Sequence, residues 1–227
     1  MAPSPLPSPP WGARGQVVTL VLASTSPRRY QILALLGLPF LMVPPAYQEL
    51  GARRAVPLPE QEALDRARQK AASLVSRFPE AVILGSDTLI NLDGLLVGKP
   101  GSPDDARAIL RRLRGRSHDV VTAVSILYQS KTVDAVETAK VAMRDFTDTE
   151  LDAYLATGDP LDKAGAYSIQ GAGRDLVASL DGDYLAVVGL PLRAVAQGLA
   201  KLGCPVTADV DRLYRERDFL NWRTFKS

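Results

Sequence analysis

The sequence predicts an α/β fold with a mixed central sheet, on two observations. Runs of β-favouring residues alternate along the chain with segments whose apolar residues recur at helical spacing. In addition, two pairs of neighbouring strand segments, 89–92 with 95–97 and 120–128 with 132–146, are joined by very short polar stretches typical of antiparallel hairpins. Because alternation favours parallel strands and hairpins add antiparallel ones, both kinds of pairing are expected in one sheet.

The first half of the chain begins with a Pro-rich stretch. Residues 1–15 are expected to form a disordered extension, because proline removes backbone donors and fixes φ. A strand is predicted at 16–23 and a helix after it, with Ser26 as the N-cap and Pro27 in the first turn. The next predicted elements are a helix over 59–78, a buried strand over 81–88 and a hairpin over 89–97 with Asp93-Gly94 at its tip.

The second half continues the alternation and ends in a segment without an assignment. Ser102-Pro103 opens a helix that ends at Gly115, and the capping box formed by Thr147 and Glu150 opens another that ends near Gly158. Further elements are expected as strands at 165–169 and 184–188 and a last helix at 191–202. The predicted domain therefore spans 16–203, and 204–227 is a C-terminal extension that we expect to be dispensable for chemistry.

Composition limits the possible partners and cofactors. The 27 Lys and Arg residues against 25 Asp and Glu give a net charge of only +2, so neither nucleic acid nor a membrane surface is expected as a partner. The lone Cys204 and the lone His118 exclude an internal disulfide, a thiolate zinc site and a multi-histidine metal site. A metal, if used, would be a hard cation held by carboxylates. With no apolar stretch long enough for a membrane span and no signal-peptide pattern, we expect a cytoplasmic protein.

The junction between the first strand and the first helix is a candidate anion site. Ser24 to Arg29 would present free backbone N–H groups at a helix N-terminus, together with the guanidinium groups of Arg28 and Arg29. A phosphate would fit there. The alternative, of equal weight for such a turn alone, is that Ser26 only caps the helix and that both arginines are solvated.

Three other segments carry candidate chemistry. Asp87 is expected at the carboxyl end of a buried strand, where open α/β sheets bind ligands, although it could instead cap a neighbouring loop. Lys99, between Gly98 and Pro100, lacks the spacing of a Walker A loop. In the segment 162–171, the Gln170 amide could read a base edge through both a donor and an acceptor, although by itself it is better explained as a loop residue.

The remaining reactive or charged residues have simpler explanations. His118 and Cys204 lack the partners of a catalytic triad, so His118 is expected to be a surface or capping group and Cys204 to be buried in packing. The basic run from Arg111 to Arg116 could contact RNA. A solvated face at a helix end is the favoured interpretation, because interleaved aromatic residues are missing.

Five segments occur in a specific order: Ala23 to Arg29, Asp87-Thr88, Gly98 to Pro100, Asp162 to Gly171, and Val187 to Pro191. Taken together they resemble the Maf family of nucleoside triphosphate pyrophosphatases, over a region from about Val18 to about Leu202. The resemblance implies a two-lobed fold related to inosine triphosphate pyrophosphatases, with a deep cleft between the lobes, and a homodimer. It also implies cleavage of the α–β phosphoanhydride of a nucleoside triphosphate, with Mg²⁺ or Mn²⁺ as the cofactor, to a nucleoside monophosphate and pyrophosphate.

The resemblance also implies roles for particular residues. Ser24, Arg28 and Arg29 would hold phosphate, and Lys70, Lys99 and Lys163 would balance charge on the substrate. Glu49 and Asp87 would hold the metal or activate water, and family descriptions treat the equivalent of Asp87 as the proton acceptor.

Within the family, the dTTP and UTP subgroup is indicated at three positions, Arg28, Thr88 and Gln170, and it also accepts modified uridine triphosphates. A non-catalytic regulator of cell division that binds nucleotide is the alternative, and the set of charged residues at these motifs favours the enzyme.

Overall fold

The computed structural model describes residues 18–47 and 58–225, and within them seven strands form one mixed sheet. Strand β1 pairs in parallel with β2 and β3, and every other pairing is antiparallel. The predicted fold class is therefore confirmed. The sheet order is β2 (Phe40–Val43), β1 (Leu20–Ala23), β3 (Val82–Leu92), β5 (Ser117–Tyr128), β6 (Lys131–Met143) and β7 (Val177–Asp181), with β4 (Leu95–Val97) paired to the far end of β3.

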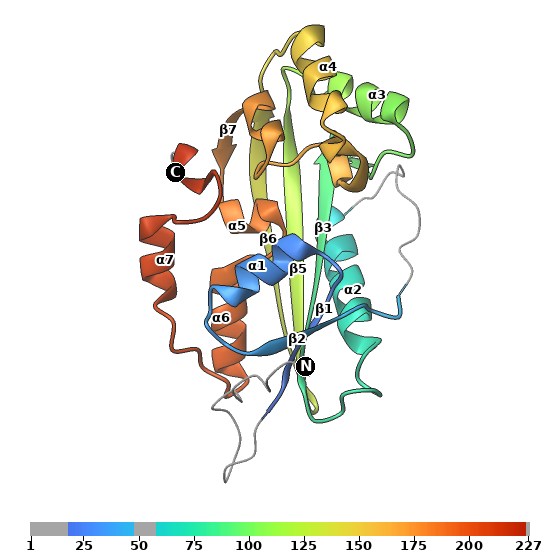
Figure 1. Ribbon diagram of the computed structural model, residues 1–227. Helices are drawn as coiled ribbons and strands as arrows, with labels where there is room; N and C mark the ends of the chain where they lie inside the picture. Colours follow the sequence, from blue (N-terminus) through green and yellow to red (C-terminus); the bar gives the residue numbers. More distant parts are fainter. Residues whose placement is uncertain (1–17, 48–57, 226–227) are drawn as a thin grey trace, which may run out of the picture.

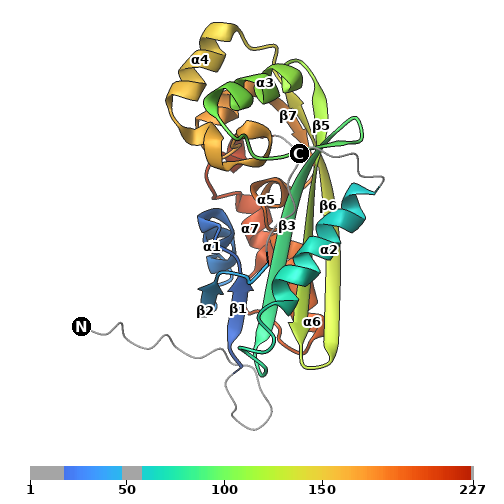
Figure 2. The same cartoon turned by 90° about the vertical axis from the view of Figure 1, so that its right-hand side faces the viewer.

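Helices cover both faces of this sheet (Figures 1 and 2). On one face α2 packs across β3 and β5, and on the other face α5 and α6 pack on β5 and β6, with α1 beside α5. Alternate residues of β3 divide between the faces, since Ile83 and Leu89 join small clusters with α2 while Leu84 and Ile90 join the main core. The helices are α1 (Pro27–Ala34), α2 (Pro59–Ala72), α3 (Pro103–Leu113), α4 (Asp148–Ala156), α5 (Tyr184–Val188), α6 (Leu192–Lys201) and α7 (Val210–Glu216).

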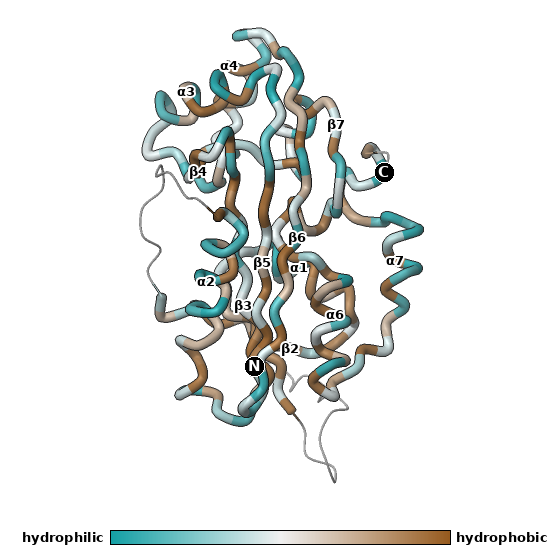
Figure 3. Tube along the Cα trace, turned by 180° about the vertical axis from the view of Figure 1, so that it is seen from behind, coloured by the Kyte–Doolittle hydropathy of each residue, from teal (hydrophilic) through white to brown (hydrophobic). Residues whose placement is uncertain are grey.

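The long strands β3, β5 and β6 connect two groups of elements. At one end lie α3, α4 and β7, and at the other end lie β1, β2, α1 and α6 (Figure 1). Hydrophobic residues concentrate on the central strands, whereas hydrophilic residues are frequent in α2, α3 and α7 (Figure 3). In the part of the chain described, no helix combines the length and the apolar character that a membrane span requires.

The capping and turn residues in the sequence predicted several elements correctly. Ser26 caps α1 and Ser102 caps α3, each with proline in the first turn. Thr147 and Glu150 form the expected capping box of α4. Asp93-Gly94 turns the hairpin between β3 and β4, with φ of 52° and 80° at the two residues. The predicted extension over 1–15 lies outside the described residues.

Other expectations were wrong. The segments 81–88 and 89–92 form one strand, β3, because β5 pairs with it continuously from Ile83 to Asn91. Residues 165–169 contain a short 3-10 turn instead of a strand, with φ of 72° at Gly165 and 58° at Ala166. Residues 184–188 form α5 in place of a strand. The Asp183 side chain caps α5 and Gly189, at φ 129°, ends it, so capping outweighs the β propensity of its valines.

Candidate active site

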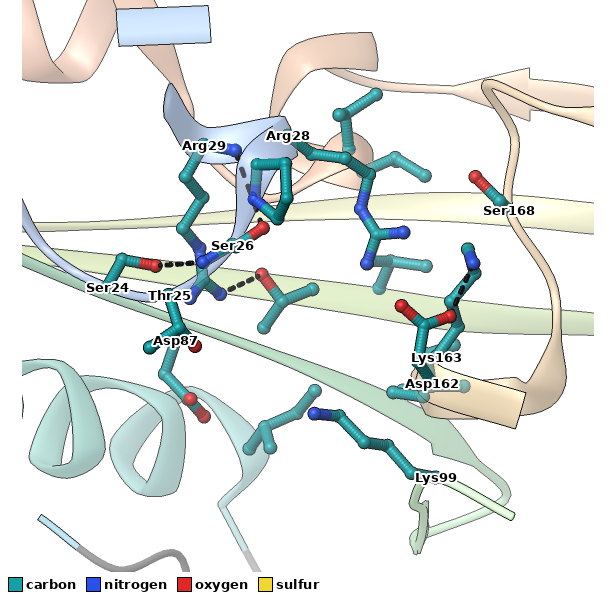
Figure 4. Close-up of a pocket in the computed structure, with 18 of the residues that line it drawn as sticks. Ser24, Thr25, Ser26, Arg28, Arg29, Asp87, Lys99, Asp162, Lys163 and Ser168 are labelled. Carbon is teal, nitrogen blue, oxygen red and sulfur yellow. Dashed lines mark hydrogen bonds and ion pairs between the residues drawn. The ribbon is translucent and has the colours of Figure 1, made fainter. Parts of the chain in front are cut away.

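A pocket of about 1000 Å³ opens between the two groups of elements, and its close-up is shown in Figure 4. The β1–α1 junction, α2, β3 and the segment after β4 contribute to one side of it, and the segment 159–171 contributes to the other. The pocket brings together all the predicted site residues that the structure describes: Ser24, Arg28, Arg29, Lys70, Asp87, Thr88, Lys99, Lys163 and Gln170. Glu49, predicted as a metal ligand, lies outside the described residues.

The β1–α1 junction has the backbone geometry of an anion site. The Ser24 hydroxyl accepts a hydrogen bond from the Ser26 N–H at 3.0 Å, and the Ser26 hydroxyl accepts one from the Arg29 N–H at 3.5 Å. Within the described part of the chain, the backbone N–H groups of Thr25 and Arg28 have no acceptor. These two donors, the positive end of the α1 dipole and the half-buried Arg28 side chain favour a phosphate here.

Arg29 lies in the same pocket, but its guanidinium contacts protein oxygen atoms. Its Nε donates to the Gly189 carbonyl at 2.9 Å and its Nη2 donates to the Thr88 hydroxyl at 3.1 Å. The Thr88 hydroxyl also lies 3.0 Å from Thr122 Oγ1. Arg29 thus joins α1 to β3 and to the end of α5, which makes Arg28 the stronger of the two candidates for direct phosphate contact.

Asp87 and Lys70 form a buried ion pair on the α2 face of the sheet. Lys70 Nζ lies 2.6 Å from Asp87 Oδ1, and the two residues are only 5% and 3% exposed. Asp87 is in the middle of β3 and not at its end, contrary to the prediction. It still lies just beyond the carboxyl end of the neighbouring strand β1, because β1 ends at Ala23 and Ala23 pairs with Gly85. Asp87 is therefore still at the edge of the sheet where open α/β sheets bind their ligands.

Two further lysines, Lys99 and Lys163, lie in the part of the pocket away from Ser24 and Arg29 (Figure 4). Lys99 is exposed and follows β4, whereas Lys163 is buried. Lys163 Nζ donates to the Asp159 carbonyl at 2.6 Å and to Asp162 Oδ1 at 2.5 Å. The hydrogen bond from Lys163 is the main cause that lowers the pKa of the Asp162 carboxyl group. Lys163 is thus largely neutralised by protein groups, and Lys99 is the better placed to meet an incoming anion.

Gln170, a residue of the pocket wall, has a side-chain donor without a partner among the described residues. This donor, the side-chain Nε2, is buried. A buried amide group without a partner is costly, so a ligand atom that accepts from it would be favoured. Its backbone carbonyl accepts a hydrogen bond at 2.7 Å from Asn221, in the C-terminal segment that the sequence left unassigned.

The structure corrects the expectation for His118, which is 3% exposed and not a surface or capping group. Its Nε2 lies 2.8 Å from the hydroxyl of Tyr167, a residue of the pocket wall. Burial lowers the pKa of His118 to about 4 and raises that of Tyr167, so both side chains are neutral near pH 7. Cys204 is buried, as expected. Arg111 and Arg114 pair with Asp148 on the surface, which favours the solvated-face interpretation of the basic run.

Arg66 is a pocket residue that sequence reasoning missed. It is 6% exposed, pairs with Glu62 at 2.8 Å and lies one helical turn before Lys70 on α2. Its position four residues before Lys70, which puts both side chains on one face of the helix, could have indicated it from the sequence. Asn221 had no comparable local signal, since it is distant in sequence from every motif.

No group of three or more His, Cys, Asp or Glu side chains that could hold a metal occurs within 18–47 and 58–225. The described carboxylates of the pocket are those of Asp87, Asp159 and Asp162. Mg²⁺ commonly binds through one or two protein carboxylates plus the phosphate oxygens of a substrate. The donor set therefore fits a cation that is held jointly with a phosphate ligand.

The family model for Maf-like proteins matches residues 19–202 of this chain. A dTTP/UTP pyrophosphatase of Moorella thermoacetica is 46% identical over 189 residues, which cover 82% of this chain and 96% of that protein. A dTTP/UTP pyrophosphatase of Dictyoglomus thermophilum is 41% identical over 188 residues, covering 81% and 96% of the two chains. A third dTTP/UTP pyrophosphatase, of Bacillus velezensis, is 40% identical over 180 residues, covering 79% and 94%.

Proposed function

This chain belongs to the family of Maf-like proteins, and on that premise we propose that it hydrolyses dTTP and UTP to the nucleoside monophosphate and pyrophosphate. The observation that carries the proposal is one pocket with an open anion-binding turn on one wall and a buried carboxylate, Asp87, close by. Several relatives that match most of this chain are named for this activity.

The triphosphate would bind along the first turn of α1. The N–H groups of Thr25 and Arg28 offer two fixed donors, and the Arg28 guanidinium adds a planar pair of donors that suits phosphate oxygens. Lys99, in the segment after β4 that also lines the pocket, would balance the charge that grows on the leaving pyrophosphate. With cations from two segments of its wall, the pocket can bind the triphosphate through more than one phosphate group.

Asp87 is the group proposed to act on the attacking water. Lys70 holds its Oδ1 at 2.6 Å, which fixes the carboxylate in one orientation on β3. From there it would accept the proton of a water that attacks the α-phosphorus. We propose Mg²⁺ or Mn²⁺ as the cofactor, held by Asp87 and Glu49 with the triphosphate. When bound, such a cation supplies charge neutralisation and a more acidic water.

Base selection is proposed to depend on Gln170. The edge of uracil or thymine presents an acceptor, a donor and an acceptor, and the Gln170 amide supplies complementary groups. Cytosine has an amino group where uracil has a carbonyl, so it would leave buried groups mismatched. We therefore expect UTP, dTTP and 5-substituted uridine triphosphates to be preferred over CTP and 7-methyl-GTP.

The experiment is an initial-rate assay with equal concentrations of UTP, dTTP, CTP and 7-methyl-GTP, with and without Mg²⁺, in which all phosphate-containing products are identified. We expect pyrophosphate and monophosphate, formed only with the cation and fastest from UTP and dTTP. Nucleoside diphosphate with orthophosphate as the only products would refute the reaction. A higher kcat/KM for CTP or 7-methyl-GTP would refute only the base assignment. Nucleotide binding without turnover of any substrate would favour the cell-division regulator.

We also propose a cytoplasmic homodimer. Strand β2 is at one edge of the sheet, and Leu41 and Met42 on it are about 40% exposed. Tyr30, 46% exposed, packs on Phe40 of the same strand. Exposed apolar groups on a sheet edge favour association with a second copy. Light scattering after size-exclusion chromatography should report twice the mass of the chain, and a monomer at micromolar concentration would contradict the proposal.

A further inference from the structure

The C-terminal segment Asp209–Phe225 lies beyond the family match, which ends at residue 202, yet it packs on the body of the protein. Helix α7 lies beside α6, and the chain then runs back toward β7 (Figure 1). Trp222 and Phe225 are 5% and 4% exposed. Trp222 stacks on Tyr184 with ring centroids 5.6 Å apart and an interplanar angle of 12°. Aromatic burial of this extent indicates a docked segment with a fixed position.

One residue of this segment contacts the loop that carries Gln170. Asn221 Nδ2 donates to the Gln170 carbonyl at 2.7 Å and lies 3.2 Å from the Ile169 carbonyl and 3.4 Å from that of Gly171. Asn221 has a φ of 62°, a backbone conformation that asparagine tolerates better than most residues. Its neighbour Leu220 lines the pocket itself. The segment therefore reaches the wall that is proposed to contact the base.

Ile169 is buried in the main core, but among the described residues few other hydrogen bonds hold the Gln170 loop. Within the described part of the chain, the Gln170 N–H donates one long hydrogen bond, 3.4 Å, to the Ser168 hydroxyl. The nearest strong anchors are the Ser168 N–H, which donates to the Tyr154 hydroxyl at 3.1 Å, and the Gly171 carbonyl, which accepts from Arg174 at 3.1 Å. Among the described residues, Asn221 is the partner of the Gln170 carbonyl. The peptide group that orients the Gln170 side chain thus depends on a residue outside the matched domain.

We propose that Asn221 is a positioning residue, which holds the Gln170 loop so that the Gln170 amide faces the base, and that the C-terminal segment is therefore part of the specificity apparatus. This inference rests on the proposed function. It replaces the expectation that the segment after Cys204 is dispensable for chemistry. The physical reason is that discrimination by hydrogen bonding depends on alignment, which a loop with a free carbonyl would lose.

The test compares Asn221→Gly with the matched control Arg223→Ala. Glycine tolerates the positive φ and removes the whole side chain, including the amide that donates to the loop. Arg223 is exposed, and its contacts are to Glu216 and Asp218 within the segment, so its loss perturbs the segment without touching the loop. Pyrophosphate release from UTP and CTP gives kcat and KM for each variant, and thermal unfolding reports stability. All assays are run well below the unfolding temperature of the weakest variant.

We expect Asn221→Gly to lower the ratio of kcat/KM for UTP over CTP by ~10-fold, mainly through a higher KM for UTP. Arg223→Ala should keep the wild-type ratio. In the Gln170→Ala background, adding Asn221→Gly should change the ratio less than twofold, because two residues that act through one contact are not additive. Asn221→Asp keeps the side-chain volume, cannot donate, and should lower the ratio in the same way if the glycine variant is unstable.

Other outcomes separate the two proposals. An unchanged ratio in a folded Asn221→Gly or Asn221→Asp protein, or an equal loss for both substrates, would overturn the role of Asn221 and leave the proposed function standing. A wild-type chain that releases pyrophosphate without preferring UTP would overturn both the base assignment and the role of Asn221. No pyrophosphate from any substrate would instead mean that the proposed function fails.

Discussion

Lys70 Nζ and Asp87 Oδ1 are 2.6 Å apart in the interior, although Lys70 belongs to α2 and Asp87 to the middle of β3. Neither residue is more than 5% exposed, so each charge helps to offset the other's loss of hydration. Both residues also line the pocket, together with the first turn of α1, which is the proposed anion site. The same ion pair therefore contributes both to the stability of the fold and to the proposed chemistry.

Asp87→Asn should lower kcat by ~10²-fold or more, because the amide keeps the shape of the carboxylate but cannot accept a proton or hold a cation. The measurement is pyrophosphate release from UTP, with circular dichroism to verify folding. The matched control is Asp93→Asn at the exposed tip of the β3–β4 hairpin, which should retain wild-type turnover. Near-normal turnover in folded Asp87→Asn would exclude both proposed roles of this residue.

Lys70→Met should destabilise the fold by about 3 kcal/mol, because it leaves the buried Asp87 carboxylate without its ammonium partner. Urea unfolding monitored by tryptophan fluorescence gives the free energy. Adding Asp87→Asn to Lys70→Met should recover more than half of the loss, since the remaining buried group is then neutral. A double variant as unstable as the sum of the two single variants would show that the two charges are not coupled.

Gly85→Ala should be strongly destabilising, by roughly 3 kcal/mol or more, because α2 lies directly against β3 at this position. A Cβ at residue 85 would lie 2.2 Å from the Ala67 carbonyl oxygen and 2.8 Å from the Ala71 nitrogen. Since both are backbone atoms, α2 would have to move, and Lys70 with it. Gly101→Ala is the control, as its Cβ would have only Asp105 Oδ2 nearby, at 4.0 Å. Comparable urea midpoints for the two variants would contradict this account of the packing.

His118 should make the protein less stable as the pH falls below about 6.5. Burial lowers its pKa from 6.5 to about 4, so between these values the unfolded chain binds a proton that the folded chain does not. The effect is absent above pH 6.5 and approaches about 3 kcal/mol at pH 4. The free energy of unfolding should therefore fall less steeply in His118→Gln than in the wild type over this range. Parallel pH profiles for the two proteins would show that His118 does not titrate as stated.

Much of the fold was predictable because its signals are local. The N-caps of α1, α3 and α4 and the turn at Asp93-Gly94 are each encoded within about four neighbouring residues. The family match confirms the motif assignment, and every predicted site residue that the structure describes lines one pocket. The strands expected at 165–169 and 184–188 were wrong because their β propensity was outweighed by positive-φ backbone and by caps at Asp183 and Gly189.

The sequence by itself determined the class of fold, the family and the residue types of the site, since hydrophobic periodicity, caps and motif spacing are properties of neighbouring residues. Only the tertiary structure decided which of these residues meet. The contacts of Lys70 with Asp87, of Arg29 with Gly189 and of Asn221 with Gln170 span 17, 160 and 51 residues of chain. Such contacts form when helices and strands pack against one another, and they leave no pattern in the local sequence on either side.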